Sequence, residues 1–439
     1  MRTPRLPRWL YPGMHLKRWL VLLFAGIAIL GLGAAIFIRD LYRTTNADEI
    51  TIVYWLTGAW LDPQVRAGLV AGLGLVLTAI GVWGLMRSVI SPFVARGNSV
   101  LEVLYTKRYL ARGPRIVAIG GGTGLSTLLR GLKGYSANIT AVVAVADDGG
   151  SSGQLRQQLG IVPPGDIRNC IAALADAEPL MTQLMQYRFP PGSGLDHHAF
   201  GNLFIAAMTA VTGDFEEAVR ESNRVLAVRG QVLPATSVPL NLSARLGSGR
   251  TLYGQVGITK ADEPIEQVMI EPADVRANQE ALERILEADL IVIGPGSLYS
   301  SVLPNLLISD VRDALAAAAG LKVYVCNVAT QPGETDHLTA SQHLSALFAH
   351  IGTDLIDYVV INRNSSARRP EGWRAEPVAV DVRDLESMPV VIVEEDVIDP
   401  HNAHRHDPAK LAAALIRLQQ DDRVEPRDRR LRRPSARAS

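Results

Sequence analysis

The residues of this sequence best suited to chemistry are glycines and hydroxyl side chains that follow a short apolar stretch. Residues 116–119 are apolar, and the small residues after them are Gly120, Gly121, Gly122, Thr123 and Gly124. Glycine lets the backbone turn sharply, and backbone N–H groups at the start of a helix attract an anion. The run therefore predicts a phosphate-binding turn, although a glycine turn between a strand and a helix can also be merely tight.

A second apolar run, 141–146, leads into acidic and small residues, which are Asp147, Asp148, Gly149, Gly150, Ser151, Ser152 and Gly153. Two neighbouring carboxylates at a strand end could hold Mg²⁺, largely through water. Alternatively, an aspartate accepts hydrogen bonds from the N–H groups of its own loop. Asp147 and Asp148 are therefore candidates for metal binding and for catalysis, with a structural role as the alternative.

The run 163–169 adds a third carboxylate and a guanidinium group. Asp166 is a further catalytic candidate, and its alternative role is to cap the helix that follows. Arg168 can bind a phosphate in fork geometry, and Asn169 stands next to it. This run is therefore a candidate for phosphate or metal binding.

The dinucleotide-binding fingerprint fits this sequence imperfectly. Gly120 and Gly122 are correctly spaced, but Leu125 stands where a third glycine would fall. Asp147 ends the second apolar run, yet it is followed by another acid and by glycines, which is unusual for a ribose clamp. Nicotinamide binding is therefore the less favoured alternative.

A second glycine turn, 294–301, follows the apolar run 290–293, and its candidate ligand contacts are Gly296, Ser297 and Tyr299. Further apolar runs end in polar residues at 326–327 and at 362. The carboxyl ends of parallel strands share one edge of a sheet. We therefore predict that the turns at 120–124, 147–153 and 294–301 line one crevice.

Two polar segments contain closely spaced histidines. His198 and Asn202 open a helical run, and because adjacent histidines face different directions, we expect only one of the pair at 197–198 to face a ligand. The second segment, 401–407, contains three histidines and could suggest a metal site. It ends in an aspartate before Pro408, a pattern typical of a helix cap, and we favour the cap.

The elements that must position these residues alternate between strand-like and helical runs. The strand-like runs are 115–119, 139–145, 288–293, 321–326, 356–361, 376–381 and 390–394. The amphipathic helical runs are 125–133, 200–211, 214–227, 273–287, 302–318, 339–349 and 407–418. This alternation predicts an α/β fold, a mostly parallel sheet with helices on both faces. Residues 228–272 break the rhythm and predict a small β-rich insertion.

The N-terminal part of the chain predicts a membrane hairpin. Residues 19–38 and 67–86 are apolar stretches of about 20 residues, long enough to span a bilayer as helices, and a second span after the first argues against a cleaved signal peptide. Arginine and lysine are in excess outside the hairpin on both sides, which predicts that both termini are cytoplasmic. We therefore expect a two-span protein of the cell membrane with its main domain in the cytoplasm.

Composition excludes some classes of partner. The chain of 439 residues has 44 basic and 44 acidic residues, and a net charge of zero does not favour nucleic acid. Its two cysteines cannot form a disulfide framework.

The sequence therefore predicts four parts of the chain. They are the membrane hairpin 1–90, a linker 91–114, the α/β domain 115–418 and a disordered arginine-rich tail 419–439.

The α/β part resembles the family of the bacterial gluconeogenesis factor, which is related to 2-phospho-L-lactate transferase. The stretches that carry the resemblance are IGGGTGLSTLLRGLK, VADDGGSSGQLR, PPGDIRNC, HAFGNLF, GDFEEA, LAVRGQVLP, IGPGSLYSSVLPNLL, VYVCNVATQPGETD and HDPAKL. They cover roughly 115–418 in order, whereas the membrane spans and the tail lie outside them. The typical factor is a soluble cytoplasmic protein, so tethering is a departure.

The resemblance implies a Rossmann-like fold and a nucleotide-sugar ligand, UDP-N-acetylglucosamine or a similar UDP-sugar. It implies a role in carbon metabolism, gluconeogenic growth and cell shape, with protein partners in cell-wall or carbon metabolism, and we expect a homo-oligomer. It assigns 120–124, 147–153 and 166–169 to phosphate or metal. His198, Asn202, Ser297 and Tyr299 would line the rest of the site.

Two activities remain open at this stage besides the nicotinamide alternative. The first is a binding protein that senses a nucleotide sugar, which the lack of an obvious general base favours. The second is a Mg²⁺-dependent transferase that, like the related enzymes, uses a nucleoside-diphospho-lactate donor and passes phospho-lactate to a deazaflavin alcohol.

Overall fold

The computed structural model describes residues 109–424, except 177, 368–371 and 373, together with the isolated positions 27, 28, 31 and 35. The chain divides into two compact units, Met1–Tyr109 and Leu110–Ser439, and almost all described residues belong to the second. Most of the predicted membrane hairpin, most of the linker and most of the tail therefore lie outside the described residues. Within the described part, no helix has both the length and the apolar character needed to cross a bilayer.

The core of the second unit is a parallel sheet of seven strands. The strand order is β10-β9-β8-β7-β1-β2-β3, and every neighbouring pair is parallel. All residues of β1, β2, β7 and β8 are buried, because helices cover both faces of the sheet. The strands are β1 (Ile116–Gly120), β2 (Ile139–Val143), β3 (Gln231–Pro234), β7 (Leu290–Ile293), β8 (Leu321–Val325), β9 (Tyr358–Asn362) and β10 (Val391–Glu395).

The order of the strands reverses at β1. From β1 the chain moves outward through β2 to β3, and it then returns to β7 on the other side of β1 and moves outward again to β10. Right-handed crossovers in opposite directions place their helices on opposite faces of the sheet. The gap between the carboxyl ends of β1 and β7 is therefore the topological switch point, where ligands bind in open α/β sheets.

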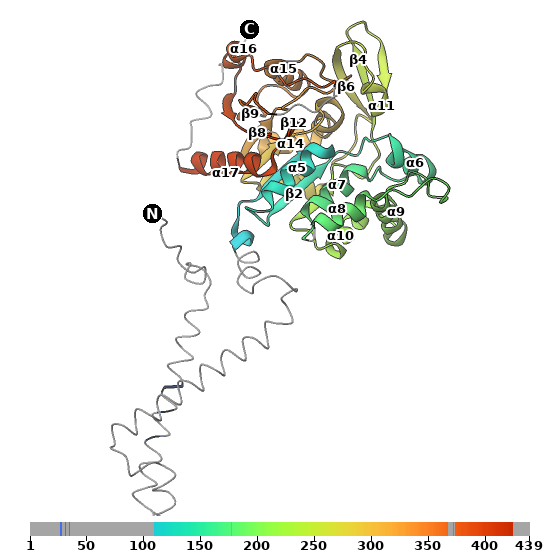
Figure 1. The fold of residues 1–439 in the computed structure, drawn as a ribbon, viewed down its shortest axis with the longest axis vertical. Coiled ribbons are helices and arrows are strands. Elements are labelled where there is room, and N and C mark those ends of the chain that lie inside the picture. The colour runs from blue at the N-terminus through green and yellow to red at the C-terminus, as the bar shows by residue number, and fades with distance from the viewer. Residues whose placement is uncertain are drawn as a thin grey trace, which may run out of the picture. The chain divides into compact units, whose positions relative to one another are not determined.

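Helices form a layer on each face. On one face α5 (Gly122–Leu132) packs against both α7 (Gly165–Leu174) and α17 (Pro408–Val424), and Figure 1 shows α5 lying between them. On the other face α12 (Gln279–Glu287) packs against α14 (Ser309–Ala317). The remaining helices are α6 (Gly150–Leu159), α8 (Glu178–Gln186), α9 (Phe200–Thr212), α10 (Phe215–Val225), α11 (Gln255–Ile258), α13 (Leu303–Leu306), α15 (Ala340–Ile351) and α16 (Val382–Glu386), with the 3-10 helix η3 (Leu110–Arg112) and the π-helix η4 (Leu298–Val302).

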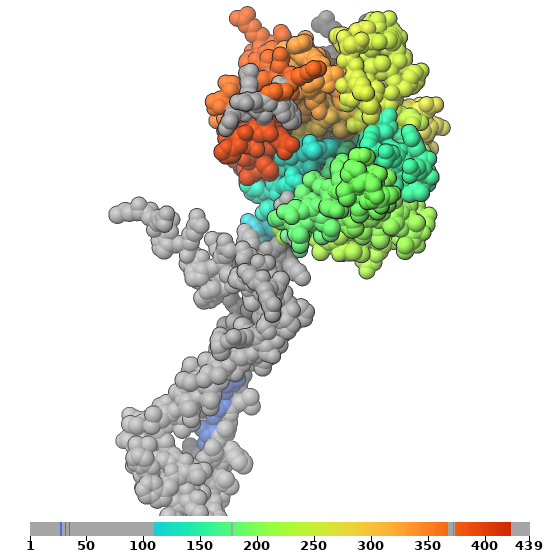
Figure 2. Space-filling model, turned by 45° about the vertical axis from the view of Figure 1, so that its right-hand side comes forward, coloured from blue at the N-terminus to red at the C-terminus, as the bar shows by residue number. Residues whose placement is uncertain are grey.

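Two small antiparallel sheets complete the domain. The insertion forms a sheet of three strands, β4 (Asn241–Leu246), β5 (Thr251–Tyr253) and β6 (Ile265–Glu271), in the order β5-β4-β6. Figure 2 shows the insertion in yellow, next to the orange C-terminal part of the domain. The second sheet pairs β11 (Ile398–Asp399) with β12 (Asn402–His406) and precedes α17.

The predicted α/β class, parallel sheet, covering helices and β-rich insertion are confirmed, with two corrections. Residues 376–381 are not a strand of the sheet and form only an isolated bridge, between Ala329 and Pro377. This segment instead runs beside the loop after β8, and Asp381 accepts a hydrogen bond from Ser341 N at the start of α15. Residues 231–234, which were predicted inside the insertion, pair with β2 in the main sheet.

Candidate functional site

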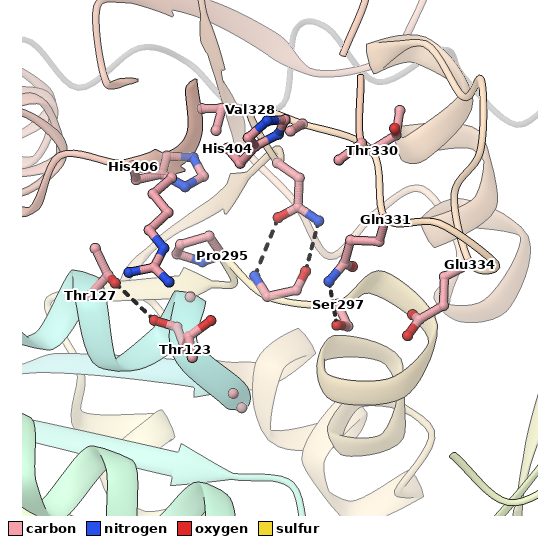
Figure 3. Close-up of a pocket in the computed structure, with 18 of the residues that line it drawn as sticks. Thr123, Thr127, Pro295, Ser297, Val328, Thr330, Gln331, Glu334, His404 and His406 are labelled. Carbon is pink, nitrogen blue, oxygen red and sulfur yellow. Dashed lines mark hydrogen bonds between the residues drawn. The ribbon is translucent and has the colours of Figure 1, made fainter. Parts of the chain in front are cut away.

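A cavity of about 370 Å³ opens at the switch point. We call it the glycine cavity, because the turns at 121–124 and 295–297 form its floor. The loop 327–334 after β8 and residues 404–406 of β12 line it as well, and the insertion contributes Gln255 and Thr259. Figure 3 shows residues from all but the last of these segments facing one space. The predicted meeting of the turns at 120–124 and 294–301 is therefore present in the structure.

The first turn packs directly on the second. A Cβ atom built on Gly124 would lie 2.6 Å from the carbonyl oxygen of Pro295. Gly122 has a φ of +65°, a conformation that side chains other than glycine rarely adopt. The N-cap residue of α5, Gly121, makes no side-chain cap, so the N–H groups of the first turn beyond that of Gly122 are available to an anion. The hydroxyls of Ser126 and Thr127 both donate to the carbonyl of Thr123 and are thus used inside the helix.

The second turn is held by the end of the neighbouring strand. Asn327 Nδ2 donates to the carbonyl of Gly296 over 2.9 Å, and Gly296 N donates to Asn327 Oδ1 over 3.4 Å. Ser297 Oγ accepts a hydrogen bond of 2.6 Å from Gln331 Nε2 (Figure 3). These bonds join the β7 turn and the β8 loop into one wall of the glycine cavity.

The carboxylates of the predicted metal site point in different directions. Asp147 Oδ1 accepts from Gly149 N over 3.0 Å, which is the loop role proposed as the alternative. Asp148 Oδ1 accepts from Val256 N over 3.0 Å and so faces the insertion. Within the described part of the chain, no group of three or more His, Cys, Asp or Glu side chains is arranged to hold a metal ion.

Asp166 is the carboxylate that lies at the first turn. A Cβ atom on Gly121 would collide with Asp166 Oδ2, and the backbone of Gly122 forms a hydrogen bond with the carboxyl group. Burial, followed by the nearby negative charge of Asp147, raises the pKa of Asp166 to about 6. The fold thus pairs Asp147 with Asp166 rather than with Asp148. Burial also lowers the pKa of Arg168. Arg168 Nη2 donates a hydrogen bond of 3.0 Å to Asn169 Oδ1.

A second group of predicted residues forms a polar cluster outside the glycine cavity. Ser151 Oγ lies 3.1 Å from His198 Nδ1, and Asn202 Nδ2 donates to Ser151 Oγ over 3.0 Å and to Ser152 Oγ over 3.3 Å. We call these four residues the α6–α9 cluster, because the bonds join the first turn of α6 to the first turn of α9 and to His198, which lies two residues before α9. Gly149 and Gly150 begin α6 beside it. The predicted contacts therefore occupy two adjoining places, the glycine cavity and the α6–α9 cluster, instead of one crevice.

Two predicted contacts are turned away from the cavity. Tyr299 is buried in the π-helix η4, and its hydroxyl donates to the carbonyl of Ile265 over 3.3 Å. Burial, and secondarily Glu334, raises the pKa of Tyr299 to about 12. Gly120 ends β1 inside the sheet, and its carbonyl accepts from Asn305 Nδ2 over 3.2 Å.

The sequence prediction missed several cavity residues, and four of them bear on the chemistry of the site. Gln331 and Glu334 lie in the loop after β8, a few residues beyond the polar residues at 326–327 that the sequence indicated. Arg405 is exposed and is the only lysine or arginine among the described residues that line the cavity. His406 is buried and donates from Nε2 to the carbonyl of Cys326 over 3.2 Å, and burial lowers its pKa to about 4.

The histidine segment of β12 ends in the predicted helix cap. Asp407 Oδ1 accepts from Ala409 N and Lys410 N, both over 2.9 Å, at the start of α17. The cap reading of this segment is therefore confirmed.

Comparison with known proteins finds similar bacterial proteins, some of which match most of the chain and others only about 70% of it. A family model described as "2-phospho-L-lactate transferase CofD" matches residues 116–398. A putative gluconeogenesis factor of Nostoc sp. is 46% identical over 430 residues, which cover 93% of this chain and 92% of that protein. The gluconeogenesis factor of Bacillus subtilis is 46% identical over 314 residues, covering 70% of this chain and 99% of that one.

A solved structure agrees with the fold. The crystal structure of a member of the UPF0052 family from Bacillus halodurans is 44% identical in sequence and superimposes with a TM-score of 0.66. The superposition covers 70% of this chain and 99% of the chain from Bacillus halodurans.

Proposed function

The chain belongs to the gluconeogenesis factor family, and from that premise we propose that it binds a nucleotide sugar of the UDP-N-acetylglucosamine kind in the glycine cavity. Binding would let it regulate carbon metabolism, gluconeogenic growth and cell shape through protein partners. The observation that carries the proposal is the direct packing of two glycine turns at the switch point of a parallel sheet.

The diphosphate would lie against the first turn. The N–H groups at the start of α5 and the positive end of the helix attract negative charge there. Arg405 of β12 also lines the cavity, and arginine binds phosphate through two parallel hydrogen bonds. A side chain at Gly122 would be strained, because its φ of +65° favours glycine.

The sugar and the base would lie along the β7 and β8 loops. A volume of about 370 Å³ is within the usual range for small-molecule sites. The walls there are polar and fixed by the bonds that Asn327 and Gln331 make to the second turn. This region can therefore recognise hydroxyl and amide groups that a diphosphate alone does not have.

A Mg²⁺-dependent phospho-lactate transferase is the second candidate, and one observation favours it. Asp147 and Asp166 lie close enough for the charge of one to raise the pKa of the other, beside the turn proposed for phosphate. Two such carboxylates suit Mg²⁺, which would neutralise the charge that develops on a transferred phosphodiester. In that case Asp147 and Asp166 would hold the metal, and Asp148 would keep its structural bond to the insertion.

Isothermal titration calorimetry of the full-length chain separates the candidates. We expect heat with UDP-N-acetylglucosamine, with or without Mg²⁺, and none with GDP or NADH. Gly122→Val should abolish this heat, while Gly257→Ala, a change in α11 that meets open space, should leave it unchanged. Binding of GDP only in the presence of Mg²⁺, and turnover of a lactyl nucleotide that Asp147→Asn abolishes, would instead establish the transferase.

We propose further that residues 1–90 tether the domain to the cytoplasmic face of the cell membrane. The match to the Nostoc relative spans 93% of the chain and so must extend into the first unit, Met1–Tyr109. Deletion of residues 1–109 should move the protein from the membrane fraction to the soluble fraction. Protease added outside intact cells should spare residues 90–439, and digestion of that part would contradict the orientation.

A further inference from the structure

The loop after β8 carries a buried carboxylate that the proposed phosphate site does not use. Glu334 is only 6% exposed and lines the glycine cavity. Its Oε1 atom accepts a hydrogen bond of 2.7 Å from Ser300 Oγ. Its Oε2 atom is buried and has no hydrogen-bond partner among the described residues. One oxygen of the carboxyl group is therefore fixed by the protein, and the other is left for a donor from outside.

A second acceptor stands on the same loop. Gln331 Nε2 donates to Ser297 Oγ, which leaves Gln331 Oε1 buried and without a partner in the described part of the chain. The N–H groups of Glu334 and Thr335 both donate to the carbonyl of Gln331, over 3.0 and 2.9 Å, so the backbone makes a tight turn between the two residues. Figure 3 shows Gln331 and Glu334 on one side of the cavity, with Ser297.

Two orphaned acceptors indicate the chemistry of the missing partner. Buried polar atoms are nearly always hydrogen-bonded in native proteins, and an unpaired buried acceptor is costly. Burial raises the pKa of Glu334, while the hydroxyl of Ser300 and the nearby N–H groups of Ser300 and Tyr299 oppose that rise. A ligand group that satisfies both acceptors must therefore offer two hydrogen-bond donors.

The position of the loop identifies the part of the ligand that reaches it. Strand β8 is two strands from β1 in the sheet, and neighbouring strands are about 4.8 Å apart, so the carboxyl ends of the two strands lie about 10 Å apart. A sugar ring joined to a diphosphate can span that distance. Its vicinal hydroxyls supply two adjacent donors, whereas a uracil ring offers a single N–H group.

We propose that Glu334, with Gln331 beside it, is the specificity-determining contact for the vicinal hydroxyls of the ligand's sugar ring. This inference rests on the proposed nucleotide-sugar binding and names the residues that would select the sugar. The ribose and the hexose of a UDP-sugar share this diol chemistry, and the test must tell them apart.

The test is calorimetry on the full-length chain with three probes, which are UDP-N-acetylglucosamine, UDP and inorganic pyrophosphate. Glu334→Leu removes both acceptors at similar volume, and Glu334→Gln keeps the shape of the side chain in case the first variant fails to fold. Glu283→Gln, on the exposed surface of α12, is the matched control. We expect Glu334→Leu to lower the affinity for UDP-N-acetylglucosamine roughly tenfold to a hundredfold, and Glu334→Gln to lower it roughly tenfold. Pyrophosphate affinity should stay within about twofold of the wild-type value, since the probe reaches only the glycine turns.

The outcomes separate this inference from the function on which it rests. A loss with both UDP and the UDP-sugar assigns Glu334 to the ribose, and a loss with the UDP-sugar alone assigns it to the hexose. Unchanged UDP-sugar affinity in both variants overturns the inference and leaves the proposed function standing. An equal loss of pyrophosphate affinity also overturns it, because the effect would not lie at the sugar. Wild-type protein that binds no UDP-sugar overturns the proposed function and this inference together.

Discussion

Replacing Gly124 by alanine tests the contact on which the site depends. The added Cβ would lie 2.6 Å from the carbonyl oxygen of Pro295, whereas ordinary contact begins at 3.4 Å. One of the two turns would therefore have to move by about 0.8 Å, and the obstacle is backbone, which cannot rotate away as a side chain would.

The expected cost of Gly124→Ala follows from that overlap. Inserting a methyl group into a packed region costs about 1–3 kcal/mol, and alanine returns about 0.5–1 kcal/mol through its higher helix propensity. We expect a net loss of about 1–2 kcal/mol in the free energy of unfolding and a fall of about 2–5 °C in Tm for a domain of this size. Because the shift disturbs the N–H groups of the first turn, sugar-nucleotide affinity should fall roughly tenfold or more.

Thermal unfolding followed by circular dichroism measures the stability change, and calorimetry with UDP-N-acetylglucosamine measures the affinity. Gly257→Ala is the control, because a Cβ there meets nothing within 4 Å. It should leave the affinity unchanged and raise stability slightly. If Gly124→Ala unfolds and binds like the wild type, the two glycine turns are not in contact and the cavity described above is wrong.

Three further substitutions probe the carboxylates and the buried histidine. Asp148→Asn weakens the acceptor for Val256 N, and we expect chemical denaturation to show that the domain is destabilised by about 0.5–2 kcal/mol. Any Mg²⁺ dependence of ligand binding should be unchanged. A lost Mg²⁺ response would place Asp148 in a metal site. The pKa of Asp166 is raised from 3.8 to about 6, so its contribution to stability falls as pH rises through this window. Asp166→Asn should therefore stabilise the domain by about 1–3 kcal/mol at pH 8 and have no effect on stability below about pH 4. The pKa of His406 is lowered from 6.5 to about 4, so its contribution is present above pH 6.5 and is lost as pH falls toward 4; His406→Gln should flatten the stability profile there, and a profile as steep as that of the wild type would place the acid sensitivity elsewhere.

The central strands and their turns were predictable because burial on both faces leaves a plain trace in sequence. Strands β1 and β7 are apolar runs that end in glycine, and β2 lies in a mostly apolar run that ends at Asp147. Residues 376–381 also resemble a strand, because Val378 and Val380 alternate, yet they pair with loops instead. Local pattern therefore predicted which segments are extended but did not predict which of them join the sheet.

Other parts of the site depend on tertiary packing that no local pattern records. Helix α6 starts with Gly150, two serines and Gly153, which are poor helix formers, and a Cβ atom at Gly153 would collide with the carbonyl of Asp148. Tyr299 stands two residues after Ser297, so sequence spacing predicts a shared site, but the π-helix turns the ring into the interior. Glu334 is one acid among many in the sequence, and only its burial distinguishes it.

Asp166 is the residue at which the two candidate functions differ in a measurable way. Its carboxyl group touches the first glycine turn and has a pKa of about 6, so it is mostly ionised at pH 7. A diphosphate placed on that turn without a metal brings negative charge against this carboxylate, which must raise its pKa further and draw in a proton. Binding together with Mg²⁺ neutralises the same charge and needs no proton. Calorimetry at pH 7 in buffers of different ionisation enthalpy counts the protons. The sensor is supported if binding without Mg²⁺ takes up most of one proton and the Asp166→Asn variant shows no such uptake. Tight binding without any proton uptake would place the diphosphate away from Asp166 and contradict the proposed site.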